Sequence, residues 1–220
     1  MRSFLNEDLI DQFRAAANEC TDFRNSYQNI DGKNKWNILC SAMDWICITA
    51  RGIKYIKFER NTNKSDDYLS LSLMQYIVAI DVLVEAIIQL YRVIYGSDRK
   101  YPLKEDKSIF LKTITDDLYF THLRAAFGTH PVNLRSLDGS NLSKNEKFYA
   151  SWSSVAIDDD DNDFIVYLYS NKAEKTEMFE LGLNISKVNY YCRKRYDLLN
   201  DLKIKIKEID NHIKKTRYTV

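Results

Sequence analysis

IVAIDVLVEAIIQL, residues 77–90, is the most apolar run in this chain of 220 residues. Drawn as a helix, it carries apolar side chains on nearly every side, and only Asp81 and Glu85 interrupt them. This run of 14 residues with two carboxylates is too short and too charged to span a bilayer, so we expect no membrane segment. The run instead predicts the central helix of a bundle.

On both sides of this run, apolar residues recur every three or four positions, as they do in amphipathic helices. The predicted helices cover about residues 3–28, 33–60, 109–127 and 186–216, and the central helix extends from a cap at Ser65 or Asp66 to about Tyr95, where Gly96 closes it. Aromatic and β-branched residues at strand spacing predict three antiparallel strands over residues 147–157, 163–171 and 177–185. The predicted fold is therefore mainly α. It is a single domain over residues 1–220, an up-and-down helical bundle with a small three-stranded antiparallel β-meander inserted at about 147–185, before the last helix.

The composition excludes several classes of function. Lysine and arginine number 32 against 31 aspartates and glutamates, so the net charge of +1 gives no global field that would attract nucleic acid, and such a contact needs a local patch. The four cysteines show no CxxC spacing, and P-loop, GxSxG, HExxH and dinucleotide motifs are missing, so we expect no disulfide framework, no metal and no cofactor. The first residues, MRSFLNEDLI, carry acids where a secretory signal is basic and then apolar, which indicates a cytoplasmic protein.

A candidate for chemistry lies at the end of the fourth predicted helix, in the segment LRAAFGTHP over residues 123–131. Arg124 precedes His130 by six positions, and Gly128 ends the helix between them, so we expect both side chains to face one phosphate-sized site. An arginine stabilises the extra negative charge of a phosphorane-like transition state, and a histidine moves protons near neutral pH. These two groups together suit RNA cleavage without a metal.

A helical bundle with an R-x4–6-H motif at a helix end resembles the HEPN superfamily, the higher eukaryote and prokaryote nucleotide-binding domains of ribonuclease toxins, abortive-infection proteins and CRISPR ancillary nucleases. The segment DDLYFTHLRAAFGTHPVNL, residues 116–134, also resembles bacterial HEPN-like defence proteins in which a proline follows the histidine. Ala125 departs from the family pattern, in which the residue after the arginine is often polar.

The resemblance implies a homodimer in which the motifs of two protomers face each other in a cleft and form one metal-independent endoribonuclease site. Arg124 and His130 would be the catalytic pair, with 2′-OH attack on the adjacent phosphate giving a cyclic phosphate. The resemblance also implies an RNA substrate, a toxin or phage-defence role, and an antitoxin or another defence-system partner.

Further residues are candidates for supporting roles. Asp81 and Glu85 can orient Arg124 or His130, although an ion pair with a basic residue of a neighbouring helix explains them as well. The other supporting candidates are Asp117, Thr129 and Asn133, and the RNA-binding candidates are Arg135 beside the motif and Arg193, Lys194 and Arg195 on the last helix. A solvated helix face is the alternative explanation for the basic residues of the last helix.

Two other interpretations stay open. Arg124 can pair with Asp117, two turns earlier on the same helix, while His130 caps the helix end. The chain would then be a catalytically silent HEPN-like module that binds RNA or a partner protein. The motif can also occur by chance in an unrelated helical scaffold, in which case Arg124 and His130 would point apart.

Overall fold

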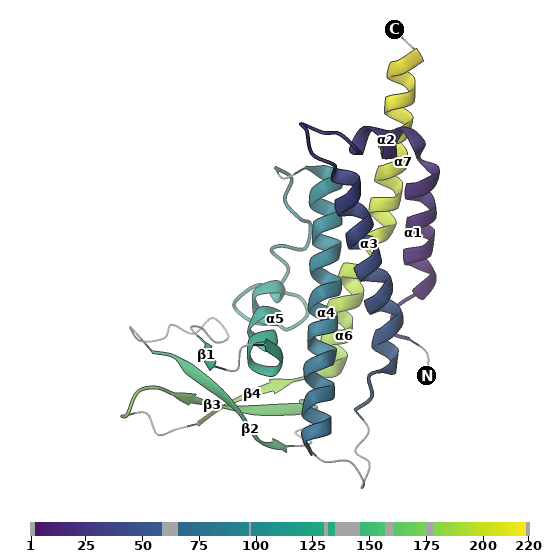
Figure 1. The fold of residues 1–220 in the computed structure, drawn as a ribbon. Coiled ribbons are helices and arrows are strands. Elements are labelled where there is room, and N and C mark those ends of the chain that lie inside the picture. Colours follow the sequence, from purple (N-terminus) through teal and green to yellow (C-terminus); the bar gives the residue numbers. More distant parts are fainter. Residues whose placement is uncertain are drawn as a thin grey trace. The chain divides into compact units, whose positions relative to one another are not determined.

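The computed structural model describes residues 3–58, 66–96, 98–129, 132–134, 146–156, 161–174 and 178–218 (Figure 1). Helices dominate these residues and a small antiparallel sheet precedes the last helices, which confirms the predicted fold class. The chain divides into two compact units. The first comprises Met1–Lys54, Val82–Pro102 and Cys192–Val220, and the second comprises Tyr55–Asp81 and Leu103–Tyr191.

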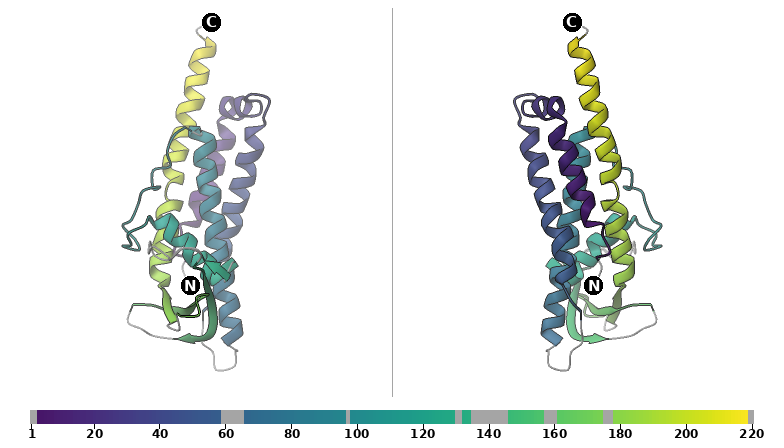
Figure 2. Two further views of the ribbon diagram at one scale, coloured as in Figure 1. Left: turned by 90° about the vertical axis from the view of Figure 1, so that its left-hand side faces the viewer. Right: turned by 90° about the vertical axis from the view of Figure 1, so that its right-hand side faces the viewer.

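The first unit is a helical bundle. Its helices are α1 (Glu7–Glu19), α2 (Thr21–Tyr27), α3 (Lys35–Gly52), the C-terminal part of α4 (Asp66–Tyr95) and α7 (Leu199–Tyr218). Helix α7, yellow in Figure 2, lies along the purple α1. The core of the unit consists of fully buried side chains from α1, α3 and α7, among them Ile10, Phe13, Ile46, Leu202 and Ile206.

The helix predicted over residues 3–28 is interrupted at Cys20, where α1 ends and α2 begins. Cys20 provides no side-chain cap for α2. The cap comes instead from α7, because the buried Asp210 carboxylate accepts a hydrogen bond from the N–H of Phe23 at 2.9 Å. A carboxylate at a helix N-terminus satisfies a free N–H and complements the helix dipole, so a new helix can start at this point.

The helix predicted over residues 186–216 is divided into α6 (Ile185–Tyr196) and α7, separated by a two-residue turn. Tyr196 anchors the end of α6 to the start of α1. Its buried hydroxyl donates to the carbonyl of Asn6 at 2.9 Å and accepts from the N–H of Ile10 at 3.2 Å. One side chain thus satisfies backbone groups at the first turn of α1, which has few partners within its own helix.

The sheet lies in the second unit and has the order β1-β2-β3-β4, with every neighbouring pair antiparallel. Its strands are β1 (Val132–Leu134), β2 (Phe148–Ala156), β3 (Phe164–Ser170) and β4 (Met178–Leu183). The last three strands are those of the predicted meander, and the short β1 adds a fourth strand at its edge. In β3, the first three residues and Leu168 are buried, Tyr167 is half-buried and Tyr169 is exposed, so the alternation of a sheet with one covered face is seen only in the second half of the strand.

Helix α5 (Asp116–Arg124) begins later than the predicted residue 109. The carboxylate of the buried Asp116 accepts hydrogen bonds from the N–H groups of Ile109 and Phe110 at 3.1 and 3.0 Å, so it holds the preceding segment in a turn. The Thr115 hydroxyl then caps the helix by accepting from the N–H of Leu118 at 3.3 Å. After Arg124 the chain continues in a π-helical turn, Ala125–Thr129.

Helix α4 is long and apolar enough over Asp67–Tyr95 to cross a membrane by length and composition, with a mean hydropathy of 1.9 in its most apolar window. The apolar part of this helix is thus longer than the 14-residue run over residues 77–90. A helix of a protein core has the same composition. Between positions 73 and 90, its fully buried residues follow helical spacing: Leu73, Ile77, Ile80, Leu83, Ile87 and Leu90.

Candidate functional site

Arg124 is the last residue of α5, in the second unit. The helix is held in place by buried aromatic residues on its inner face. Phe120 stacks on Tyr191 of α6 with ring centroids 4.5 Å apart, and Tyr119 lies against Phe110 at 4.9 Å. This packing fixes the direction in which the end of α5 points.

The guanidinium of Arg124 pairs with a carboxylate of α4. Its Nη1 lies 3.0 Å from Oδ2 of Asp81, and the two side chains are 31% and 23% exposed. The sequence had offered Asp117 as the partner, but Oδ1 of Asp117 accepts a hydrogen bond from the Tyr191 hydroxyl at 3.0 Å. Asp81 therefore replaces Asp117 as the ion-pair partner of Arg124.

Arg124 keeps hydrogen-bonding capacity beyond this ion pair. Its Nε is buried and has no hydrogen-bond partner within the part of the chain that the structure describes. A guanidinium carries five N–H donors in a planar fork, and the contact with Asp81 is made through Nη1. A half-buried arginine with donors to spare suits the binding of an anion such as a phosphate.

The π-helical turn that follows Arg124 lies directly against α4. A β-carbon built on Gly128 would be 3.4 Å from Cγ2 of Ile77 and 3.9 Å from Cγ of Arg124. Turns of this kind are rare and occur often at functional sites. The turn ends at the exposed Thr129, immediately before His130 in the sequence.

The other half of the predicted motif falls outside the described ranges. His130 and Arg135 are among the residues that the structure does not describe, and Asn133 lies in β1. Glu85 lies one turn beyond Asp81 on α4 and is exposed. The structure thus brings Arg124 and Asp81 together.

The predicted RNA-binding surface of the last helices needs one correction. Arg193 is exposed and Lys194 is half-buried, but Arg195 is fully buried and cannot contact RNA. Its position repeats the helical spacing of Val188, Tyr191 and Cys192, which are buried as well. This spacing is the signal that could have placed Arg195 on the inner face of α6.

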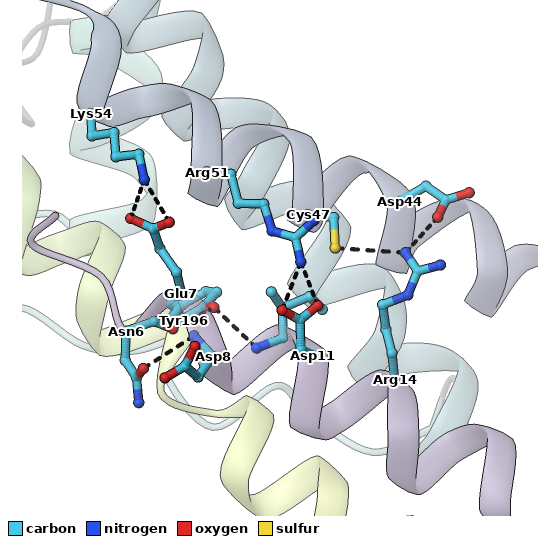
Figure 3. A network of polar contacts seen from close by, with 11 residues as sticks. Asn6, Glu7, Asp8, Asp11, Arg14, Asp44, Cys47, Arg51, Lys54 and Tyr196 are labelled. Carbon is cyan, nitrogen blue, oxygen red and sulfur yellow. Dashed lines mark hydrogen bonds and ion pairs between the residues drawn. The ribbon is translucent and has the colours of Figure 1, made fainter.

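A second polar cluster, not predicted from the sequence, joins α1 to α3 and to the 3-10 turn after α3, Ile53–Tyr55, in the first unit (Figure 3). It is a ladder of three ion pairs: Lys54 with Glu7 at 2.7 Å, Arg51 with Asp11 at 2.6 Å, and Arg14 with Asp44 at 2.6 Å. The hydrogen bond to Asp44 raises the pKa of Arg14, and the hydrogen bond to Asp11 raises that of Arg51. Every charge of the ladder has an opposite partner, so we interpret it as a connection between antiparallel helices.

Three of the four cysteines offer no activated nucleophile. All four are free, and burial raises the pKa values of Cys20, Cys40 and Cys192. A thiol that stays protonated at neutral pH is a weak nucleophile and a poor metal ligand. Within the described ranges, no group of three or more histidine, cysteine, aspartate or glutamate side chains is placed to hold a metal ion.

Comparisons of this chain with models of protein families, with curated proteins and with solved structures find no match. The HEPN resemblance therefore rests on the R-x5-H motif and its surroundings. The structure adds to this motif the geometry at the end of α5.

Proposed function

We propose that the chain is a metal-independent endoribonuclease of the HEPN type, with Arg124 and His130 as its catalytic pair. The observation that carries this proposal is the Arg124 guanidinium, which is half-buried at a helix end, oriented by Asp81 at 3.0 Å, and followed by a π-helical turn that leads to His130. A half-buried guanidinium suits a phosphate, and His130 is the first histidine after the turn in the sequence.

The proposed chemistry divides the work between two groups. His130 accepts the proton of the ribose 2′-OH, whose oxygen attacks the adjacent phosphate. The bond from phosphorus to the 5′-oxygen of the next nucleotide breaks, this oxygen takes up a proton from water, and the products are a 2′,3′-cyclic phosphate and a 5′-hydroxyl. Arg124 stabilises the negative charge that develops on the phosphoryl oxygens. Asp81 is a positioning residue, because it holds the guanidinium through Nη1.

The setting of this activity follows from the resemblance. We propose a homodimer whose motifs form one composite site, acting in the cytoplasm on RNA in a toxin or phage-defence context. An antitoxin or another defence-system protein would then control it, since an unrestrained ribonuclease harms the cell that makes it.

A second candidate function is a catalytically silent HEPN-like module that binds RNA or a partner protein. The ion pair between Arg124 and Asp81 favours it, because such a pair between two helices also has a purely structural explanation. The exposed Arg193 and the half-buried Lys194 of α6 would then contribute to binding a phosphate backbone.

Cleavage of a mixed RNA substrate in EDTA tests the first candidate. We expect the wild type to cut and to leave cyclic phosphate ends, and we expect His130→Ala and Arg124→Ala each to lower the rate by about 100-fold or more. His212→Ala is the matched control, because His212 is an exposed histidine on α7. Equal rates in all four proteins would contradict the proposed site.

Asp81→Asn separates the two candidates. If Arg124 acts on a phosphate, loss of its orienting carboxylate lowers the cleavage rate by about 10- to 100-fold. If the chain is a silent module, the wild type cuts no RNA in EDTA, and the substitution changes only the free energy of unfolding or the affinity for a partner. Urea denaturation and RNA binding measured on the same proteins distinguish these outcomes.

A further inference from the structure

Strand β4 forms an edge of the sheet. The strand order β1-β2-β3-β4 places it beside β3, and its other side has no neighbouring strand among the residues that the structure describes. Its first three residues, Met178, Phe179 and Glu180, are exposed, whereas Leu181 and Leu183 are buried. An edge strand presents a row of backbone N–H and C=O groups that can pair with another chain. The exposed end of β4 is therefore open to a further strand.

The register of the sheet shows which backbone groups of β4 face β3. In an antiparallel pair, opposite residues alternate between those that exchange hydrogen bonds and those that do not. The N–H of Asn171 donates to the carbonyl of Lys147 at 3.0 Å, so the backbone groups of Asn171 and of Tyr169, two residues earlier, point toward β2. Those of Leu168, between the strands' paired residues, then point toward β4, where Leu168 lies opposite Phe179. The backbone groups of Phe179 therefore point toward β3.

Alternation along β4 directs every second residue away from β3. The N–H and C=O groups of Met178, Glu180 and Gly182 thus point to the open side. The carbonyl of Leu183 agrees with this alternation, since it accepts from the N–H of Asp163, the residue before β3, at 2.9 Å. Each of the three outward residues offers one donor and one acceptor, at the two-residue spacing that another extended chain presents.

The exposed end of β4 lacks most of the features that protect edge strands from pairing. Such strands commonly carry proline or lysine, or are twisted away by a bulge. The sequence of β4, MFELGL, contains neither residue, and its register with β3 is continuous. Met178 and Phe179 are 55% and 41% exposed and lie on opposite faces of the strand. An added strand would therefore find an apolar contact on each face.

Glu180 is the single charge of β4, and it determines which strand fits beside it. If two copies of the chain paired their outward residues antiparallel, Met178 would lie opposite Gly182 and Glu180 opposite Glu180. Like charges directly opposite each other are destabilising, whereas opposite charges stabilise a strand pair. A strand with a basic residue at this position is therefore favoured over a second copy.

We propose that β4 binds an extended segment of a partner protein as a further strand of the sheet, with a lysine or arginine opposite Glu180 and apolar side chains next to it. In strand addition, backbone hydrogen bonds provide the affinity and alternate side chains provide the specificity. The interaction uses neither Arg124 nor His130, so the proposal stands whether or not the chain cleaves RNA.

Two synthetic peptides test the charge preference. The lysine peptide is acetylated and amidated Ser-Thr-Val-Lys-Val-Val-Thr, and the glutamate peptide has glutamate in place of the lysine. In NMR titrations of the full chain, we expect the lysine peptide to bind with a Kd on the order of 100 µM and the glutamate peptide about fivefold more weakly. Glu180→Lys should reverse this preference. Absence of binding up to about 1 mM, or equal binding of the two peptides, would overturn the proposal.

Hydrogen exchange of the wild type locates the bound strand. Without peptide, the amides of Met178, Glu180 and Gly182 should exchange faster than those of Phe179 and Leu181, which face β3. With the lysine peptide bound, we expect exchange of the three outward amides to slow by about tenfold, while the two inward amides change little. Peptide binding without protection of the outward amides would overturn strand addition at β4.

Two substitutions of Glu180 separate its backbone from its side chain. Glu180→Gln removes the charge and keeps the outward N–H, whereas Glu180→Pro removes both, and an edge strand tolerates proline where the N–H faces solvent. We expect the glutamine variant to bind the lysine peptide about threefold more weakly than the wild type, and the proline variant about 30-fold more weakly. The urea midpoints of both should stay close to that of the wild type. Equal binding by the two variants would show that the backbone of β4 does not pair with the peptide, and would overturn the proposal.

Discussion

Asp210 in the first unit and Arg124 in the second are both charged residues in contact with another helix, but their surroundings differ. Asp210 is 3% exposed, and its carboxylate binds the Lys214 ammonium at 2.7 Å and the N–H of Phe23 at 2.9 Å. Arg124 is about a third exposed and pairs with Asp81, while its buried Nε makes no hydrogen bond within the described residues.

The difference separates a structural charge from a candidate functional one. The contacts of Asp210 lie within the protein and complete the start of a helix, so its removal should cost stability. Arg124 keeps donors beyond its ion pair at the point where α5 leaves regular helical geometry, so its removal should cost function. An ion pair alone therefore does not identify a site, and the remaining hydrogen-bonding capacity is the more informative property.

The largest effect is expected at Arg124. Arg124→Lys keeps the positive charge beside Asp81 but replaces the planar fork by a single ammonium, so we expect RNA cleavage to fall by about 100-fold while the free energy of unfolding changes by less than about 1 kcal/mol. Initial rates in EDTA and urea denaturation provide the two measurements. Full RNA cleavage by the Arg124→Lys variant would mean that Arg124 acts only as a paired positive charge.

Asp210→Ala should lower the stability of the protein and have little effect on RNA cleavage. It leaves the N–H of Phe23 without its partner and removes the cap of α2, so we expect the free energy of unfolding to fall by about 2 to 3 kcal/mol in urea denaturation. Asp201→Ala is the control on the same helix, because Asp201 is exposed, and it should cost less than about 0.5 kcal/mol. Equal losses in the two variants would mean that Asp210 is not a cap.

The pH dependence of stability sharpens the same comparison. Burial of the Asp210 carboxyl raises its pKa, but the hydrogen bonds from Lys214 and Phe23 outweigh burial, so this pKa lies below its ordinary value. Such a group stabilises the fold above its unfolded pKa of about 3.9, and the stabilisation is lost as pH falls through the lower folded pKa. The difference in unfolding free energy between wild type and Asp210→Ala should therefore be constant from about pH 7 to pH 5 and shrink below about pH 4. A difference that stays constant to pH 2 would contradict this assignment.

The smallest effect is expected in the ladder between α1 and α3. Arg51 and Asp11 are about half exposed, and water and salt compete with their ion pair. Arg51→Ala should leave the urea midpoint close to that of the wild type, with any difference shrinking at 1 M salt. A decrease in unfolding free energy as large as that of Asp210→Ala would show that the ladder is a major contributor to stability.

The sequence predicted the helices and the meander because their spacing is local, but it did not predict where helices break. The start of α2 depends on Asp210, which is 187 residues away from Phe23, and a local pattern contains no information about that distance. The late start of α5 depends on Asp116, which lies inside the helix predicted over residues 109–127 and gives no local signal that it binds the N–H groups before it.

The candidate site was predictable in part for the same reason. The helix end at Arg124 follows from local spacing and stop signals, whereas its pairing with Asp81 depends on how α4 and α5 pack within the second unit. Asp117 was a reasonable partner on a single helix, but Tyr191 of another helix contacts it instead. The burial of Arg195 was not predicted, because positively charged side chains are usually exposed. Its position nevertheless repeats the spacing of the buried residues of α6.

The cap that α7 provides to α2 also constrains the order in which the chain can fold. The first unit is assembled from three separated segments, and the last of them, Cys192–Val220, supplies both Tyr196 and Asp210. During synthesis at roughly 5 to 20 residues per second, the N-terminal helices wait many seconds for these partners while their apolar faces remain uncovered. Contacts between sequence-distant segments slow folding, so the N-terminal helices are the part of the nascent chain that most needs protection from aggregation.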